Sequence, residues 1–84
     1  MSMIHVVYSG RNEDLEFDEV FRPDRYEALG ITDTARPENV SNDLIKRALA
    51  YHYDVAANEF EAHYIENNPN GNITVRPNAK WGVH

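Results

Sequence analysis

The sequence predicts a small α+β domain in which a helix packs on one face of an antiparallel or mixed sheet. Three observations predict this class: a β-rich N-terminal run that ends in a turn, an amphipathic helical pattern near the middle, and two alternating segments joined by an Asn-Gly turn. Eighty-four residues leave room for one domain, which we expect to span 1–84.

The first strand of an N-terminal hairpin is predicted from Met3 to Tyr8, a β-rich run that stops at the turn signal Ser9-Gly10. The segment from Leu15 to Phe21 fits either a strand or a helix. Its first residues alternate apolar and acidic side chains, and it follows a turn, so we favour a second strand antiparallel to the first. Its bulky apolar residues also match the i, i+3, i+4 spacing of a helix face: Phe17, Val20 and Phe21.

Two helices are predicted next. Pro23 suits the first position of a short helix of about two turns, and Gly30 is a natural left-handed stop. Ser41 suits the N-cap of a longer amphipathic helix over 42–53, because its hydroxyl can accept a hydrogen bond from the first turn. The apolar stripe of that helix consists of Leu44, Ile45, Ala48, Leu49 and His52.

The C-terminal part predicts a second hairpin. The segments 60–66 and 73–81 alternate apolar and polar residues, and Asn70-Gly71 between them favours a tight turn. Pro77 cannot donate a ladder hydrogen bond, so the last strand either lies at a sheet edge there or ends there. The residues expected on the apolar side are Phe60, Ala62 and Tyr64 in the first segment and Ile73, Val75, Pro77, Ala79 and Trp81 in the second.

This order, two strands, two helices and two strands, resembles the ubiquitin-like β-grasp group. The resemblance implies a non-enzymatic adaptor or modifier-like module that uses a sheet face. Ubiquitin-like modifiers and the related sulfur carriers end in a Gly-Gly pair, whereas this chain ends Trp81-Gly82-Val83-His84. A modifier or carrier role, the alternative to an adaptor, would therefore require trimming so that Gly82 is activated by a partner enzyme.

Charge and composition narrow the partners and the compartment. Eight Lys and Arg against 14 Asp and Glu give a net charge of −6, which is opposite in sign to what nucleic acid or an anionic membrane requires of a partner. The chain has no cysteine, which excludes disulfides and thiolate zinc sites and is compatible with a reducing cytoplasm. We therefore expect a cytoplasmic protein that binds other proteins.

No motif points to catalysis. The four histidines lack the spacing of a metal site, and no nucleotide-binding loop or nucleophile elbow is present. We therefore expect no catalytic residue, no cofactor and no metal. A small subunit that completes an active site in an oligomeric enzyme is a further alternative, and it would require a stable dimer.

The acidic run at the predicted first hairpin is the first candidate binding site. Five carboxylates fall within seven residues without the order of a calcium loop. The run fits a solvated strand face and turn, or an acidic edge that attracts a basic patch on a protein partner. The residues expected to bind are Glu13, Asp14, Glu16 and Asp18.

The second candidate is an open sheet face with Val7, His63 and Ile65, provided that these residues align on one side. Pairing through the last strand as an edge is a further option, including a homodimer of two copies. Taken together, these observations predict a non-enzymatic protein–protein interaction module.

Overall fold

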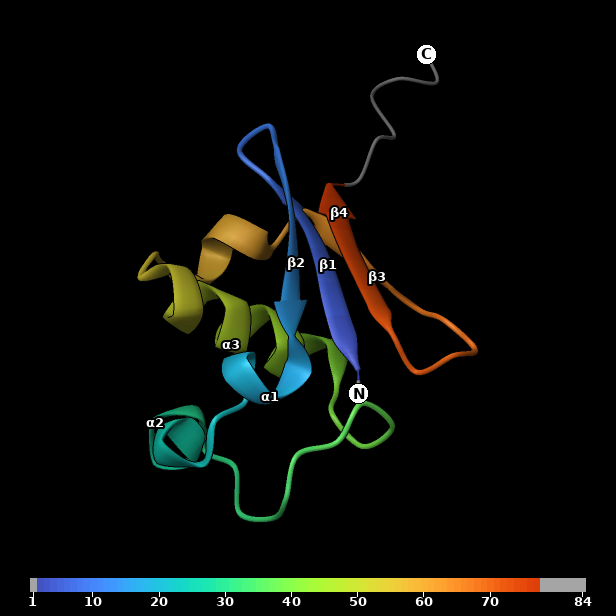
Figure 1. Ribbon diagram of the computed structural model, residues 1–84. Helices are drawn as coiled ribbons and strands as arrows, with labels where there is room; N and C mark the ends of the chain where they lie inside the picture. The colour runs from blue at the N-terminus through green and yellow to red at the C-terminus, as the bar shows by residue number, and fades with distance from the viewer. Residues whose placement is uncertain (1, 78–84) are drawn as a thin grey trace.

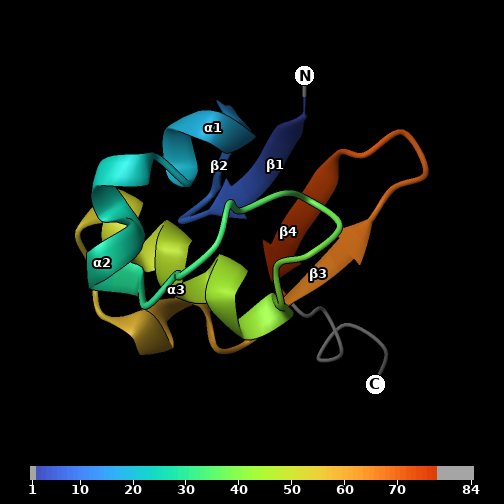
Figure 2. The same cartoon turned by 90° about the horizontal axis from the view of Figure 1, so that it is seen from below.

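A four-stranded mixed sheet with helices on one face forms the framework, so the predicted α+β class is confirmed (Figures 1 and 2). The computed structural model describes residues 2–77. Its elements in chain order are β1 Met3–Tyr8, β2 Arg11–Glu16, α1 Phe17–Val20, η1 Pro23–Arg25, α2 Tyr26–Leu29, α3 Asn42–Tyr53, η2 Ala57–Phe60, β3 His63–Asn67 and β4 Ile73–Pro77.

The first hairpin turns through Ser9 and Gly10, as predicted. Both residues have positive φ, 53° and 75°, which is the backbone of the tight two-residue turns that match strand twist. β1 and β2 pair antiparallel from Tyr8↔Arg11 at the turn to Met3↔Glu16 at the far end.

The ambiguous segment from Leu15 to Phe21 contains both of the structures that its pattern allowed. The strand ends at Glu16, where the sheet bond from Phe17 N to Ser2 O (2.9 Å) is the last of the ladder, and the helix α1 follows. The expected second strand is therefore wrong beyond Glu16. Helical geometry is favoured there because it buries three apolar side chains together: Phe17, Val20 and Phe21.

The expected helices are confirmed. The short one is split into η1 and α2, begins at Pro23 and ends where Gly30 adopts φ 74°. The long helix α3 has the predicted bounds, and Ser41 Oγ accepts a hydrogen bond from Leu44 N at 3.1 Å. Asp54, with φ 58°, ends α3 in the left-handed conformation.

The second hairpin is confirmed, but its first strand begins later than predicted. Residues 57–60 form the short helix η2, which buries Phe60, and β3 starts only at His63. Tyr64, expected in the core, is 46% exposed. Gly71 supplies the positive φ of the turn, 89°. The continuation of the last strand, with Ala79 and Trp81, and the terminal Gly82 lie outside the described residues.

The sheet order is β2-β1-β4-β3, with β1 and β4 parallel at the centre. The last strand is therefore interior, and the expectation that it offers an edge for pairing is wrong: β2 and β3 are the edges. Asn68 N donates a hydrogen bond to Asn72 O, so these two residues form a hydrogen-bonded pair. Because bonded and non-bonded pairs alternate along an antiparallel ladder, the β4 residues that make no backbone hydrogen bonds to β3 are Ile73, Val75 and Pro77. Pro77 is tolerated because its nitrogen points toward β1 beyond the last β1–β4 pair, Val6↔Val75.

The hydrophobic core lies between the sheet and α3. Each central strand contributes two residues from the same face, which matches the alternation of side chains in a strand. Phe60 and Leu49 are completely buried between these layers. The remaining core side chains include Ile4, Val6, Ile73 and Val75 from the sheet, Ile45 and Ala48 from α3, and Phe17, Val20 and Phe21 from the segment after β2.

Removing the N-cap of α3 tests how far local signals stabilise the fold. Ser41→Ala leaves the amide of Leu44 without its side-chain acceptor and should lower the free energy of unfolding by about 1 kcal/mol. Asn42→Ala, one position further and exposed, is the matched control and should change it little. Urea unfolding followed by circular dichroism measures both; equal losses in the two variants would contradict the cap.

Candidate protein-binding surface

The sheet has a helix side and an open face. Side chains of Ile4 and Val6 point to the helix side, and those of Met3, His5 and Val7 point the other way. Within residues 2–77 the helices cover only the first side (Figure 2). We call the other side the open face; the paired positions that share it are Asn12, Asp14 and Glu16 of β2, Thr74 and Arg76 of β4, and Tyr64 and Glu66 of β3.

Val7, His63 and Ile65 do not align on this face, so that expectation is wrong. Val7 lies on it, half-buried, but the pairs Ile65↔Val75 and His63↔Pro77 place His63 and Ile65 on the helix side. The cause is the late start of β3, because the alternation begins at His63 rather than at Phe60.

His63 has a structural contact in place of the expected exposed one. Its Nε2 donates to the carbonyl oxygen of Val7 at 3.0 Å, and its ring packs on Phe60 with centroids 4.9 Å apart. The Val7 carbonyl lies just past the last β1–β4 pair, where no strand satisfies it. His63 therefore completes the ladder at this end of the sheet.

The acidic run divides between the two sides. Glu13 lies on the helix side, where its carboxylate accepts hydrogen bonds from the Tyr53 hydroxyl and, at 3.1 Å, from Arg11. The hydrogen bond from Tyr53, followed by that from Arg11, lowers the pKa of Glu13, while burial and the Glu13 contact raise the pKa of Tyr53. A hollow of about 200 Å³ lies beside this pair and is lined by Val6, Tyr8, Ser9, Arg11, Glu13 and Tyr53.

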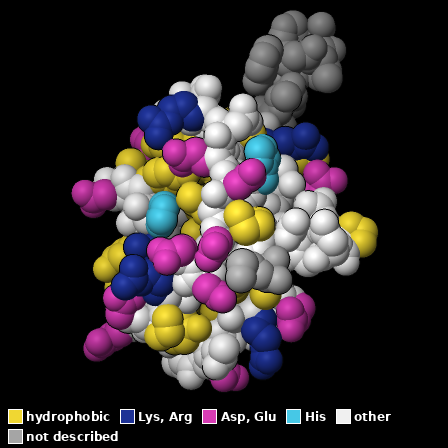
Figure 3. Space-filling view, in the orientation of Figure 1, with side chains coloured by type: hydrophobic (Ala, Val, Ile, Leu, Met, Phe, Trp, Pro, Cys, Tyr) yellow, Lys and Arg dark blue, Asp and Glu magenta, His cyan; other side chains and the backbone are white. Residues whose placement is uncertain are grey.

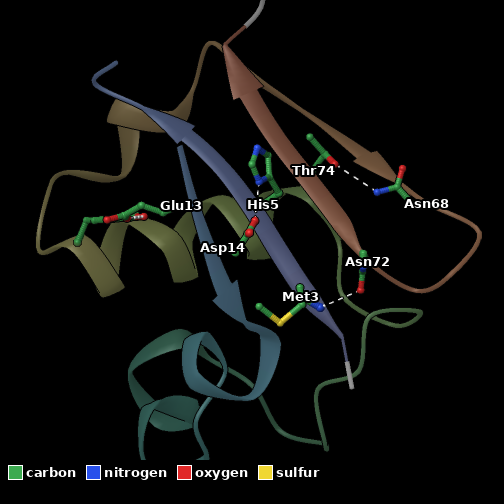
Figure 4. A network of polar contacts seen from close by, with 8 residues as sticks. Met3, His5, Glu13, Asp14, Asn68, Asn72 and Thr74 are labelled. Atoms are coloured by element: carbon green, nitrogen blue, oxygen red, sulfur yellow. Dashed lines mark hydrogen bonds and ion pairs between the residues drawn. The ribbon is translucent and has the colours of Figure 1, made fainter. Parts of the chain in front are cut away.

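Asp14 and Glu16 lie on the open face, and Asp18 is exposed in the first turn of α1. Asp14 Oδ1 is 2.6 Å from Nδ1 of its cross-strand neighbour His5 (Figure 4). Among the described residues, the carboxylates of Glu16 and Asp18 make no hydrogen bond or ion pair. In Figure 3 acidic side chains occupy the middle of this face, and Lys and Arg side chains lie toward its rim.

Within residues 2–77 no strand pairs with the outer side of the β2 backbone. The bond from Phe17 N to Ser2 O fixes which pairs exchange hydrogen bonds, because such pairs alternate along an antiparallel ladder. Counting from that pair, Leu15 and Glu13 bond to β1. The backbone N–H and C=O groups that point away from the sheet therefore belong to Asn12, Asp14 and Glu16.

The far side of the open face is held by Arg76. Its guanidinium donates to the Tyr64 hydroxyl at 3.1 Å and to Glu66 at 3.3 Å, and it lies 5.3 Å from the centroid of the Tyr64 ring. The hydrogen bond to Tyr64 raises the pKa of Arg76. The acid and base of this corner are thus already paired, and on the β2 side Asp14 contacts His5 while Glu16 has no partner among residues 2–77.

Comparison with family models, with curated proteins and with solved structures finds no match for this chain. In the described part of the chain no three His, Asp or Glu side chains come together as metal ligands. No described helix has the length and apolarity to cross a membrane. The site must therefore be interpreted from its own geometry.

The contact between Glu13 and Tyr53 is absent from the sequence-based interpretation. It joins residues that are 40 positions apart, on a strand and at the end of α3. The one signal in the sequence is the spacing of two residues between Glu13 and the apolar Leu15, which places both side chains on the same side of a strand.

Acid titration tests the Glu13 contact. Because the pKa of Glu13 is lowered in the folded state, its stabilisation is present above the ordinary value of 4.5 and is lost as pH falls through the lowered folded value. Glu13→Gln should therefore destabilise most at neutral pH, with the difference from the parent protein shrinking below about pH 4. Urea unfolding at several pH values measures it; Glu16→Gln is the control, and an identical pH profile for both variants would contradict the assignment.

Proposed function

We propose that this chain is a non-enzymatic protein–protein interaction module that binds its partner along β2 and the adjoining open face. The supporting observation is the outer side of β2, which no other strand of the described chain pairs with. There the outward backbone groups and the open-face side chains belong to the same residues, Asn12, Asp14 and Glu16. Exposed edge strands are ready templates for pairing with another chain.

We also propose a β-grasp-like arrangement for the domain. An N-terminal hairpin, a helix packed on the sheet and a C-terminal hairpin, with parallel strands at the centre, support a resemblance to the ubiquitin-like group. A cytoplasmic setting agrees with the absence of cysteine. The adaptor role depends on the sheet surface and needs no chemistry at the C-terminus.

The partner should be basic at its contact surface. Asp14, Glu16 and Asp18 are exposed, and the whole chain carries a net charge of −6. Opposite charges raise the rate of encounter more than the final affinity. A second copy of this chain would bring the same carboxylates together at β2, so the proposed partner at this edge is a different protein.

Salt dependence of association tests this proposal. The partner is first captured from the native host with the full chain and identified by mass spectrometry, and its association rate is then measured by stopped flow. Replacing Glu16 and Asp18 by Ser should slow association at low salt by up to about tenfold and flatten its dependence on salt, because two steering charges are lost.

The matched control is the pair Glu27→Ser and Glu61→Ser, which removes the same charge from exposed positions outside β2 and α1. The control should keep the salt slope of the parent protein. Equal slopes in the two double variants would show that the acidic edge does not guide the partner, and an unchanged affinity and rate in the first would reject the binding surface.

A further inference from the structure

We infer that β2 binds an extended segment of the partner as an added strand, and that this segment carries Lys or Arg at alternate positions with uncharged residues between them. The inference rests on the proposed function and specifies the chemistry of the partner at the same surface. Its basis is that the β2 residues whose backbone N–H and C=O groups point away from the sheet also have their side chains on the open face.

The outward backbone groups of β2 can pair with an added strand. An antiparallel strand added beside β2 would exchange hydrogen bonds with Asn12, Asp14 and Glu16, because these residues turn their N–H and C=O groups away from β1. Residues of the added strand directly opposite them would place their side chains on the open face. Directly opposed side chains have Cβ atoms roughly 4.5–5.5 Å apart, close enough for ion pairs.

The β2 side chains on the open face include two carboxylates, those of Asp14 and Glu16. Among residues 2–77 Glu16 has no polar partner, and the side chain of Asp14, which is 66% exposed, has His5 as its polar partner. Two carboxylates that are two residues apart on one strand match two cations at the same spacing on its neighbour. The partner therefore needs basic residues at every second position.

The alternate positions of the added strand would meet a different environment. Their side chains would turn to the helix side, toward the hollow of about 200 Å³ that Tyr8, Arg11 and Tyr53 line. The Arg11 guanidinium disfavours a second cation there, and the Glu13 carboxylate, which is bonded to Arg11 and Tyr53, disfavours a second anion. These positions are therefore uncharged, which converts a general preference for basic partners into an alternating pattern.

The other edge of the sheet lacks this match. On β3 the outward backbone groups belong to His63, Ile65 and Asn67, whose side chains lie on the helix side. None of the three is acidic. An alternating basic strand is thus complementary to β2 and not to β3.

The charges of β2 also have a simpler explanation, since charged side chains on an edge strand prevent unwanted pairing. The two explanations differ in the response to a basic strand: protection excludes it, and recognition binds it. A peptide of defined pattern separates them.

The experiment titrates the full chain with an eight-residue peptide of alternating Lys and Thr and with a peptide of the same composition in which adjacent Lys pairs are separated by two Thr. In the second peptide no two Lys residues lie two positions apart. NMR amide signals report both binding and exchange. We expect about tenfold tighter binding of the alternating peptide, with slower amide exchange at Asn12, Asp14 and Glu16, because only this peptide forms both opposed ion pairs.

Charge reversal supplies the decisive variant. In the double variant Asp14→Lys and Glu16→Lys the preference should switch to a peptide of alternating Glu and Thr. The control, Glu27→Lys with Glu61→Lys, makes the same change in net charge and should keep the original preference. Circular dichroism confirms that each variant is folded before titration.

A second variant tests the backbone pairing alone. Asn12→Pro removes one outward N–H and keeps every carboxylate, at a position that does not bond to β1. It should weaken the alternating peptide several-fold. Equal binding of both peptides, or binding without amide protection, would overturn strand addition while leaving the salt-dependent capture of a natural partner intact; binding of neither peptide would also overturn it.

Discussion

The parallel pairing of β1 with β4 is the contact on which the rest of this structure depends. Ile4 pairs with Ile73 and Val6 with Val75, and the four side chains are essentially removed from water on the helix side. Burial of this kind is the main favourable contribution to folding. It joins two hairpins that are separate along the chain, and it places their outer strands, β2 and β3, at the edges (Figure 1).

The same pairing gives each residue of β2 a definite side. Leu15 and Glu13 share the parity of the buried Ile4 and Val6, so they lie on the helix side, where the Tyr53 hydroxyl donates a hydrogen bond to the Glu13 carboxylate. Asp14 and Glu16 take the opposite parity and stay in water. A run of acids that looks uniform in the sequence is thereby divided into Glu13, which makes a contact with α3, and the exposed carboxylates of the proposed binding surface.

Local signals predicted the elements that depend on local interactions. The N-cap of Ser41 and the helical spacing after it defined α3, and the turn residues Gly10 and Gly71 located both hairpins. The start of β3 could not be predicted, because Phe60 fits an alternating strand as well as the buried turn it actually forms. Because β3 begins at His63 and not at Phe60, the side chain of His63 lies on the helix side of the sheet and not on the open face.

The pairing of strands that are distant in the chain could not be predicted from the sequence, for a physical reason. The β1–β4 register joins positions almost 70 residues apart, and no local pattern distinguishes a parallel from an antiparallel neighbour there. The position of β2 at the edge follows from that register. Consequently the sequence identifies the acidic run as a candidate site. It does not predict which backbone groups of the run point away from the sheet, or that Glu13 contacts Tyr53.

Amide hydrogen exchange of the free protein, resolved by NMR, tests the central claim most directly. If β2 is a free edge in the described register, the amides of Glu13 and Leu15 are protected by bonds to β1, and those of Asn12, Asp14 and Glu16 exchange rapidly. Uniform protection along β2 would mean that both of its sides are paired. The reverse alternation would mean that the register is shifted by one residue, and either result would contradict this account.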